Sequence, residues 1–305
     1  MRIRLSISLL LFLTSVVALA QVDYEKKLQQ ELAAHPQQDN ERVDILNELG
    51  PTPLIPFQER EKYGTEALAI SNKTGYESGK GMALAVLSSA NYGMGNRAKA
   101  DSLLQQAINV NKAINNKDLT AYILYVQATN SNIGDTRVLL PKLSEAAESL
   151  SKTNNKRMLA NCYRIIAGIY QANLTNYPKA MEFNMKALEA AEASNDLKTL
   201  IRTWESLGEL YTYMGDYENG LLYLGKASNA NKGYGNAIIG SFLQNAMGEC
   251  YRLTGKYPEA IHAYMEAIKV TDNSLNISVY ESNLADVYTR LDSLPTAFHY
   301  AFSSL

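Results

Sequence analysis

The chain has 305 residues, which is enough for two compact domains or for one elongated array of repeats. Hydrophobic residues make up 46% of it, as in an ordinary folded protein with a buried core. Its 29 Lys and Arg nearly balance its 31 Asp and Glu, which argues against a nucleic-acid surface built on bulk positive charge.

The first 20 residues differ in composition from the rest. Arg2 and Arg4 precede an apolar run over residues 5–17, and Ala-Leu-Ala follows, ending at Ala20. A basic start, an apolar middle and small residues before a cleavage point are typical of a secretory signal peptide. We predict cleavage after Ala20, an exported protein that begins at Gln21 in the periplasm or outside the cell, and no membrane span in the mature chain. The alternative is an uncleaved anchor, which the short apolar run disfavours because about 20 apolar residues span a bilayer.

A lead-in helix is expected over residues 21–40, and residues 41–305 are self-similar with a period of about 40. The stretch "SLGELYTYMGDYENGLLYLGKA" (206–227) aligns with "AMGECYRLTGKYPEAIHAYMEA" (246–267), with Gly, Tyr, Gly, Tyr and Ala recurring at matched positions. We predict units near 41–76, 81–117, 119–153, 158–195, 198–232, 238–272 and 277–305, of which the last is incomplete.

Each unit is predicted to be a pair of helices. Apolar residues recur at three- and four-residue spacing, as in Leu200, Trp204, Leu207 and Tyr211, which favours an amphipathic helix. A short turn follows in which Gly precedes Asp, Lys or Asn, because Gly adopts backbone angles that other residues resist. In three units a Pro begins the second helix, where the first-turn N–H groups have no helical partner.

These positions resemble the tetratricopeptide repeat family, whose pattern places Trp, Leu-Gly, Tyr, Ala, an aromatic residue and Ala at fixed spacings. The resemblance covers residues 41–305 and implies an all-α fold, a right-handed α–α superhelix of about seven helix-turn-helix repeats. The period is near 40 rather than 34, and "GPTPLIP" (50–56) interrupts the first helix of the first unit, which we expect to act as a cap. The residues that match the repeat pattern are Trp204, Leu207, Gly208, Tyr211, Ala227, Gly248, Tyr251, Ala260 and Ala267.

In this family the first helices line a concave groove that holds peptides or partner segments. The candidate groove residues are Arg164, Gln171, Arg202, Glu205, Glu209, Asn245, Glu249, Arg252, Asn283 and Asp286. Their mixed charges suit a peptide of mixed polarity better than a polyanion, and an ordinary solvated face is the alternative for each residue. The family's carboxylate clamp is not matched, because Gly168, Phe242 and Ala246 stand where polar or basic residues would be needed.

Sequence signatures of catalysis are absent. No Gly-rich phosphate loop, nucleophile elbow, zinc-protease or kinase motif occurs, and we interpret Glu205 and Glu209 as residues of an exposed helix face. We therefore predict no enzyme, no catalytic residue, no cofactor and no metal site, since two Cys and three scattered His do not form a zinc site of known spacing. The helical, apolar contexts of Cys162 and Cys250 favour buried free thiols over a disulfide.

The exported repeats with their long period also resemble the extracytoplasmic N-terminal regions of bacterial sensor histidine kinases and regulators that contain tetratricopeptide repeats. This resemblance implies a non-catalytic module that binds a protein or peptide and forms the sensory input of a signal-transduction protein, with an output domain further along a longer gene product. The alternative is a free-standing periplasmic scaffold for envelope protein assembly. The expected partner is a protein or peptide rather than a nucleic acid, and a homodimer is left open.

Overall fold

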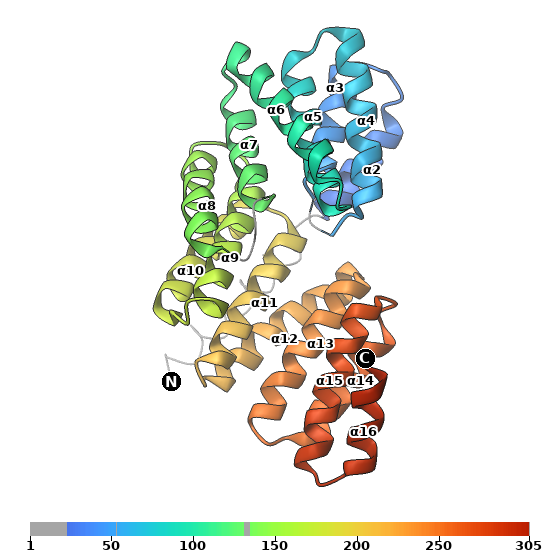
Figure 1. The fold of residues 1–305 in the computed structure, drawn as a ribbon, viewed down its shortest axis with the longest axis vertical. Coiled ribbons are helices and arrows are strands. Elements are labelled where there is room, and N and C mark those ends of the chain that lie inside the picture. The colour runs from blue at the N-terminus through green and yellow to red at the C-terminus, as the bar shows by residue number, and fades with distance from the viewer. Residues whose placement is uncertain (1–22, 53, 131–134, 305) are drawn as a thin grey trace, which may run out of the picture. The chain divides into compact units, whose positions relative to one another are not determined.

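The computed structural model describes residues 23–52, 54–130 and 135–304, so the predicted signal peptide lies outside the described residues (Figure 1). Within these ranges the chain consists of helices, labelled α2 to α16, joined by turns and short connections. None of the helices in the described part is both long and apolar enough to cross a membrane. The all-α prediction is confirmed.

The helices divide between two compact units, which we call the N-terminal unit (22–174) and the C-terminal unit (175–305). The N-terminal unit contains α2 (Tyr24–Ala34), α3 (Asn40–Leu49), α4 (Phe57–Thr74), α5 (Glu77–Gly93), α6 (Arg97–Ile114), α7 (Lys117–Thr129), α8 (Thr136–Ser151) and α9 (Lys156–Ala172). The C-terminal unit contains α10 (Tyr177–Ser194), α11 (Leu197–Tyr213), α12 (Tyr217–Tyr234), α13 (Ala237–Leu253), α14 (Tyr257–Lys269), α15 (Ser274–Arg290) and α16 (Leu294–Ser303).

Consecutive helices form hairpins in both units. The pairs α5–α6 and α7–α8 pack together in the N-terminal unit, and α11–α12, α13–α14 and α15–α16 do so in the C-terminal unit. First helices of successive hairpins also touch, since α11 contacts α13 and α13 contacts α15. This is the predicted helix-turn-helix repeat architecture. The helices α9 and α10, which the sequence places in one repeat near 158–195, belong to different units.

Local signals explain where the hairpin helices begin and end. Gly215 and Gly255 follow α11 and α13 with φ of 81° and 72°, in the left-handed region that favours glycine. The Asp216 side chain then accepts a hydrogen bond from the backbone N–H of Asn219, which caps α12. Pro residues occupy the first turn of α10, α14 and α16, as expected from the sequence.

Small residues let the paired helices approach closely. A Cβ added at Gly208 in α11 would lie 2.6 Å from Leu224 Cγ and 3.0 Å from the Gly220 carbonyl oxygen of α12. A Cβ at Gly248 in α13 would lie 2.6 Å from the ring of Tyr264 in α14. The other repeat positions are core residues, since Leu207, Ala227, Ala260 and Ala267 are fully buried.

The two aromatic repeat positions pack against neighbouring side chains. Tyr211 stacks on Tyr223 with ring centroids 5.6 Å apart. Tyr251 packs against the core cluster of α14 and α15.

The first hairpin departs from this geometry. Helix α3 ends at Leu49 after 10 residues, whereas α5 and α9 each run for 17. The expected interruption at "GPTPLIP" is therefore present, and it forms the connection between α3 and α4. Val43 and Leu46 of α3 still pack into a core cluster with Ala67, Ile70 and Ala83.

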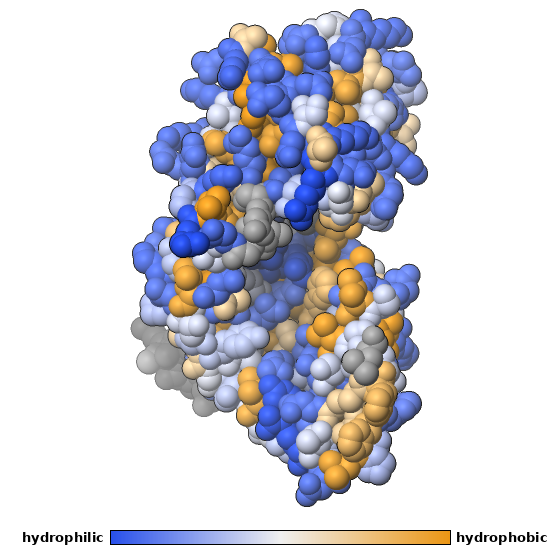
Figure 2. Space-filling model, in the orientation of Figure 1, coloured by the Kyte–Doolittle hydropathy of each residue, from blue (hydrophilic) through white to orange (hydrophobic). Residues whose placement is uncertain are grey.

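Apolar side chains are exposed on the last helices of the C-terminal unit. Leu275 and Val279 of α15 and Phe298 and Phe302 of α16 are each more than half exposed. Figure 2 shows apolar residues along the α16 surface that faces the viewer.

Candidate functional site

The sequence-predicted groove residues fall into both units. Arg164 and Gln171 lie on α9 of the N-terminal unit. The others lie on the first helices of three successive hairpins in the C-terminal unit: Arg202, Glu205 and Glu209 on α11, Asn245, Glu249 and Arg252 on α13, and Asn283 and Asp286 on α15. We call this second set the C-terminal polar face.

Within the C-terminal polar face, α13 and α15 are joined by charged groups. The Nη1 atom of Arg252 donates to Asp286 Oδ2 at 2.8 Å, and its Nε donates to Glu249 Oε2 at 2.8 Å. Arg290 Nε also donates to Asp286 Oδ2, at 3.0 Å. The bond with Glu249, with a further contribution from the Asp286 charge, raises the pKa of the Arg252 guanidinium above its ordinary value. These ion pairs hold the side chains in fixed positions across the two helices.

A second polar contact joins the same helices. Asn283 Nδ2 donates to Asn245 Oδ1 at 2.8 Å. Further into the unit, the Tyr280 hydroxyl on α15 donates to Ser241 Oγ on α13 at 3.2 Å. The structure therefore brings together five residues that the sequence only placed on a common helix face: Asn245, Glu249, Arg252, Asn283 and Asp286.

Glu205 on α11 is buried rather than exposed. It retains 4% of its accessible surface, and Arg202 Nη1 donates to its Oε2 at 2.5 Å. The Arg202 guanidinium in turn lies 5.1 Å from the ring centroid of Phe242 on α13. The interpretation of Glu205 as part of a solvated helix face is wrong, because its side chain is buried and forms an ion pair with an arginine one turn away.

Tyr213 at the end of α11 is the exposed aromatic residue beside these charges. Its side chain is 54% exposed. Partial burial, and after it the charges of Glu209 and Glu249, raise the pKa of its phenol. Leu253 at the end of α13 is 40% exposed. The C-terminal polar face thus combines fixed charges of both signs with an aromatic and an aliphatic side chain that are open to contact.

The two cysteines are core thiols, as the sequence predicted. Both are free and buried. Cys162 Sγ lies 3.4 Å from the Leu143 carbonyl oxygen, and burial raises the pKa of this thiol to about 12. No group of three or more His, Cys, Asp or Glu in the described residues could hold a metal ion.

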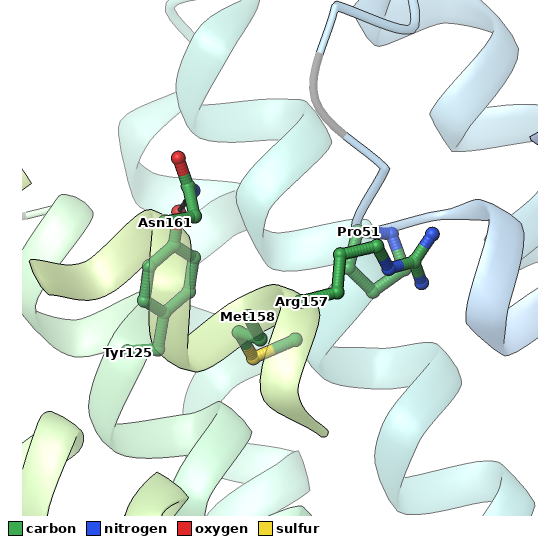
Figure 3. Close-up of a pocket in the computed structure, with 5 residues that line it drawn as sticks. All are labelled: Pro51, Tyr125, Arg157, Met158 and Asn161. Carbon is green, nitrogen blue, oxygen red and sulfur yellow. Dashed lines mark hydrogen bonds between the residues drawn. The ribbon is translucent and has the colours of Figure 1, made fainter. Parts of the chain in front are cut away.

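The N-terminal unit contains a pocket that the sequence analysis missed. It lies between the α3–α4 connection, α7 and α9 and is lined by Pro51, Tyr125, Arg157, Met158 and Asn161 (Figure 3). It is a small hollow, open to solvent, with a cavity volume of about 10 Å³. None of these residues belongs to the predicted set. The available signal was the "GPTPLIP" interruption, which shortens α3 and places Pro51 beside α9.

Arg157 joins α9 to the first hairpin through hydrogen bonds. Its side chain is 12% exposed, its Nη1 donates to Thr52 Oγ1 at 3.1 Å, and its Nη2 donates to the Glu48 carbonyl oxygen at 3.1 Å. The guanidinium also lies 4.5 Å from the ring centroid of Tyr24 on α2. The Tyr24 hydroxyl donates to the Glu48 carboxylate, which is 3.9 Å from Arg157 Nη2.

The Asn161 amide joins two neighbouring side chains, those of Tyr125 and Arg164. Its Nδ2 donates to the Tyr125 hydroxyl at 2.6 Å, while its Oδ1 accepts from Arg164 Nη2 at 2.7 Å. Because a guanidinium can only donate, Arg164 fixes which end of the amide faces Tyr125. Arg164, one of the predicted groove residues, thus acts on the pocket through Asn161. Gln171 is half-buried two turns further along α9.

The family comparison supports the repeat assignment over part of the chain. Residues 199–273, which include α11 to α14 almost entirely, match the family model described as tetratricopeptide repeat. No curated protein matches the chain.

Solved structures of helical-repeat proteins superpose on most of the chain. A Rap protein complexed with Competence and Sporulation Factor has a TM-score of 0.60 and 14% identity, with 94% of this chain and 95% of that chain covered. NprR in complex with its cognate peptide NprX has a TM-score of 0.55 and 16% identity, with 83% and 79% covered.

A third likeness is to a Signal Transduction ATPase with Numerous Domains protein with a tetratricopeptide repeat sensor, from Pyrococcus horikoshii. Its TM-score is 0.59 at 16% identity, and 86% of this chain is covered. The chain spans 44% of the length of that protein. At these identities the likenesses concern the fold. Residues 199–273 carry tetratricopeptide repeats, and the chain has the helical-repeat fold found in such proteins.

Proposed function

We propose that this chain is a non-catalytic module that binds a peptide or protein segment on the C-terminal polar face. The observation that carries the proposal is the set of fixed side chains on α11, α13 and α15. An ion pair and an amide contact join α13 to α15, and a second ion pair holds Arg202 and Glu205 within α11. Groups fixed before binding lose little conformational entropy when a ligand arrives. Their alternating charges favour one register of a mixed-polarity partner over others.

The comparisons support this proposal through the ligands of two similar folds. One neighbour is a Rap protein in complex with Competence and Sporulation Factor, and another is NprR with its cognate peptide. An exposed Tyr213 beside the fixed charges adds the kind of aromatic contact that is enriched at binding surfaces.

The wider role we propose is the sensory input of an exported signal-transduction protein. Support comes from the signal-peptide pattern of residues 1–20 and from the tetratricopeptide sensor in the larger Pyrococcus protein. The second candidate is a free-standing periplasmic scaffold, which needs only the export signal and the repeats. The coding sequence downstream of Leu305 separates the two: a kinase or DNA-binding domain in frame supports the sensor, and an immediate stop codon refutes it.

Site-specific photo-crosslinking tests the binding face directly. A benzoylphenylalanine replaces Tyr213 in one variant and the exposed Leu222 of α12, on a second helix, in the control. We expect a discrete crosslinked partner with the Tyr213 variant alone, and its loss when Arg252→Glu is added. Equal crosslinking from both positions, or none from Tyr213 in cells that express the intact system, would contradict the assignment. Sedimentation analysis of the same protein tests whether it forms a homodimer.

A further inference from the structure

We propose that the partner segment binds the C-terminal polar face in an extended, polyproline II-like conformation and contacts it with every third residue. The proposal rests on the peptide-binding function above and adds a conformation and a residue pattern to it. The pattern is two apolar side chains and one acidic side chain, each three positions from the next. The residues that recognise it are Tyr213, Leu253 and Arg290, which we call the edge row.

The edge row has one member in each of three successive hairpins. Tyr213 is the last residue of α11, Leu253 is the last residue of α13, and Arg290 is the last residue of α15. Tyr213 and Leu253 are 54% and 40% exposed, and the Arg290 side chain is 48% exposed. Residues at the same position of a repeat lie side by side when the hairpins stack. The three exposed side chains therefore repeat with the period of the helices.

Contacts between the first helices join the members of the edge row. Helix α11 contacts α13, and α13 contacts α15. Burial, and with it the charge of Glu249 on α13, raises the pKa of the Tyr213 phenol, so this carboxylate lies near the first member. Arg252, the residue before the second member, donates to Asp286 Oδ2 at 2.8 Å, and the same oxygen accepts from Arg290 Nε at 3.0 Å. The edge row thus belongs to one connected surface of the C-terminal unit.

The packing of the first helices sets the spacing of the edge row. Axes of packed helices lie about 8–10 Å apart. In a β-strand, side chains on one face recur every second residue, about 7 Å apart. In a polyproline II helix they recur every third residue, about 9 Å apart. The second spacing matches that of the helices, so every third side chain of such a segment can meet one member of the row.

The polar groups of the same face suit a segment with an open backbone. Asn283 on α15 donates to Asn245 on α13 at 2.8 Å, and both side chains are partly exposed. Each amide has more donor and acceptor sites than this contact uses. A polyproline II segment has no internal hydrogen bonds, so its backbone groups can bond to such side chains. A helical segment pairs its backbone groups internally and cannot use them in this way.

The chemistry of the edge row defines the three side chains of the partner. The Tyr213 ring and the Leu253 side chain favour apolar groups, which lose water on contact. Arg290 shares the Asp286 carboxylate with Arg252, and a guanidinium has five N–H groups. An acidic side chain therefore gains a charge-assisted hydrogen bond at Arg290. The apolar contacts supply most of the affinity, and the acidic one discriminates between partners by charge.

Binding of designed peptide pools to the purified chain from residue 21 onward tests this inference. Each fluorescein-labelled pool fixes two Leu and one Glu and randomises Ala, Gln, Ser and Pro at the other positions, with both termini blocked. All pools share one length and differ in whether the fixed residues are two, three, four or seven positions apart. Each pool is made in both chain directions. The seven-residue pool omits Pro and represents a helical segment, in which seven residues span about 10 Å.

The expected result is a preference for the three-residue spacing. The better of the two pools with this spacing should bind at least about fivefold more tightly than any pool with another spacing in fluorescence anisotropy. Equal binding of all spacings would overturn the inference and leave peptide binding on this face intact. A preference for the seven-residue spacing would overturn it as well, because the bound segment would then be helical.

Two variants assign the contacts to the edge row. Leu253→Gln should lower affinity for the three-residue pool by at least about threefold and leave a pool with Gln in place of the central Leu unaffected. Arg290→Gln should remove the preference for Glu over Gln at the acidic position. Leu222→Gln on α12 is the matched control and should retain both preferences. All three positions are exposed, so each variant is expected to fold.

The remaining outcomes separate this inference from the proposed function. A preference for the three-residue spacing that Leu253→Gln does not reduce would refute the edge row, because the contacts would then lie elsewhere. If no pool binds, the inference is refuted, and crosslinking from position 213 still decides whether a partner binds the C-terminal polar face.

Discussion

The close approach of α11 and α12 can be tested by adding one methyl group. A Cβ at Gly208 would lie 2.6 Å from Leu224 Cγ and 3.0 Å from the Gly220 carbonyl oxygen, so Gly208→Ala forces the helices apart or displaces Leu224. Overpacking of this kind costs about 1–3 kcal/mol. Ala also favours a helix interior over Gly by about 1 kcal/mol, which offsets part of that cost.

The matched control is Gly225→Ala in α12 of the same hairpin, where an added Cβ meets nothing within 4 Å. It receives the gain in helix propensity alone and should stabilise the unit by about 1 kcal/mol. The difference between the two variants therefore isolates the packing cost, about 1–3 kcal/mol, in urea unfolding followed by circular dichroism. Equal stabilisation by both substitutions would show that Gly208 does not lie against α12.

Three further predictions concern burial and export. Glu205→Met should destabilise the C-terminal unit by about 3–5 kcal/mol because it leaves the largely buried Arg202 without its partner. In urea unfolding, the double variant Arg202→Met/Glu205→Met should lose less stability than the sum of the losses of Arg202→Met and Glu205→Met. In a Cys250→Ser background, Cys162 should react with Ellman's reagent at pH 8 only upon unfolding, since its folded pKa is about 12. Its protonated thiol stabilises the fold fully below the unfolded pKa of about 8.5, and this contribution is lost as pH rises from there towards 12; reaction at the rate of an exposed thiol would contradict the burial. Mass spectrometry of the exported chain should find Gln21 at the N-terminus, and an intact Met1 would contradict cleavage.

The helical hairpins could be predicted from the sequence because their signals are local. The turn after α11 needs a residue at positive φ followed by a capping side chain, and Gly215 and Asp216 supply both within two positions. The small residues recur with the repeat, so Gly208 and Gly248 could be recognised as packing positions without knowledge of Leu224 or Tyr264. Features that a local motif or the repeat itself encodes could therefore be predicted from the sequence.

Features that depend on contacts between distant residues could not be predicted from the sequence. Glu205 is buried, and its partner Arg202 lies over the Phe242 ring of the following hairpin, a contact that the spacing of charges within α11 does not reveal. The pocket requires Arg157 to meet Thr52, a pair separated by 105 positions in the chain. The sequence located the interruption in the first hairpin and assigned it a capping role, but the pocket that it creates depends on tertiary contacts.

The ion pairs of the C-terminal polar face limit what new charge contacts can add to its affinity for a partner. On the C-terminal polar face, a partner must compete with ion pairs such as Arg252 with Asp286, so new charge contacts there largely replace existing ones. Such a face discriminates between partners through charge register and gains affinity mainly from contacts with residues such as Tyr213.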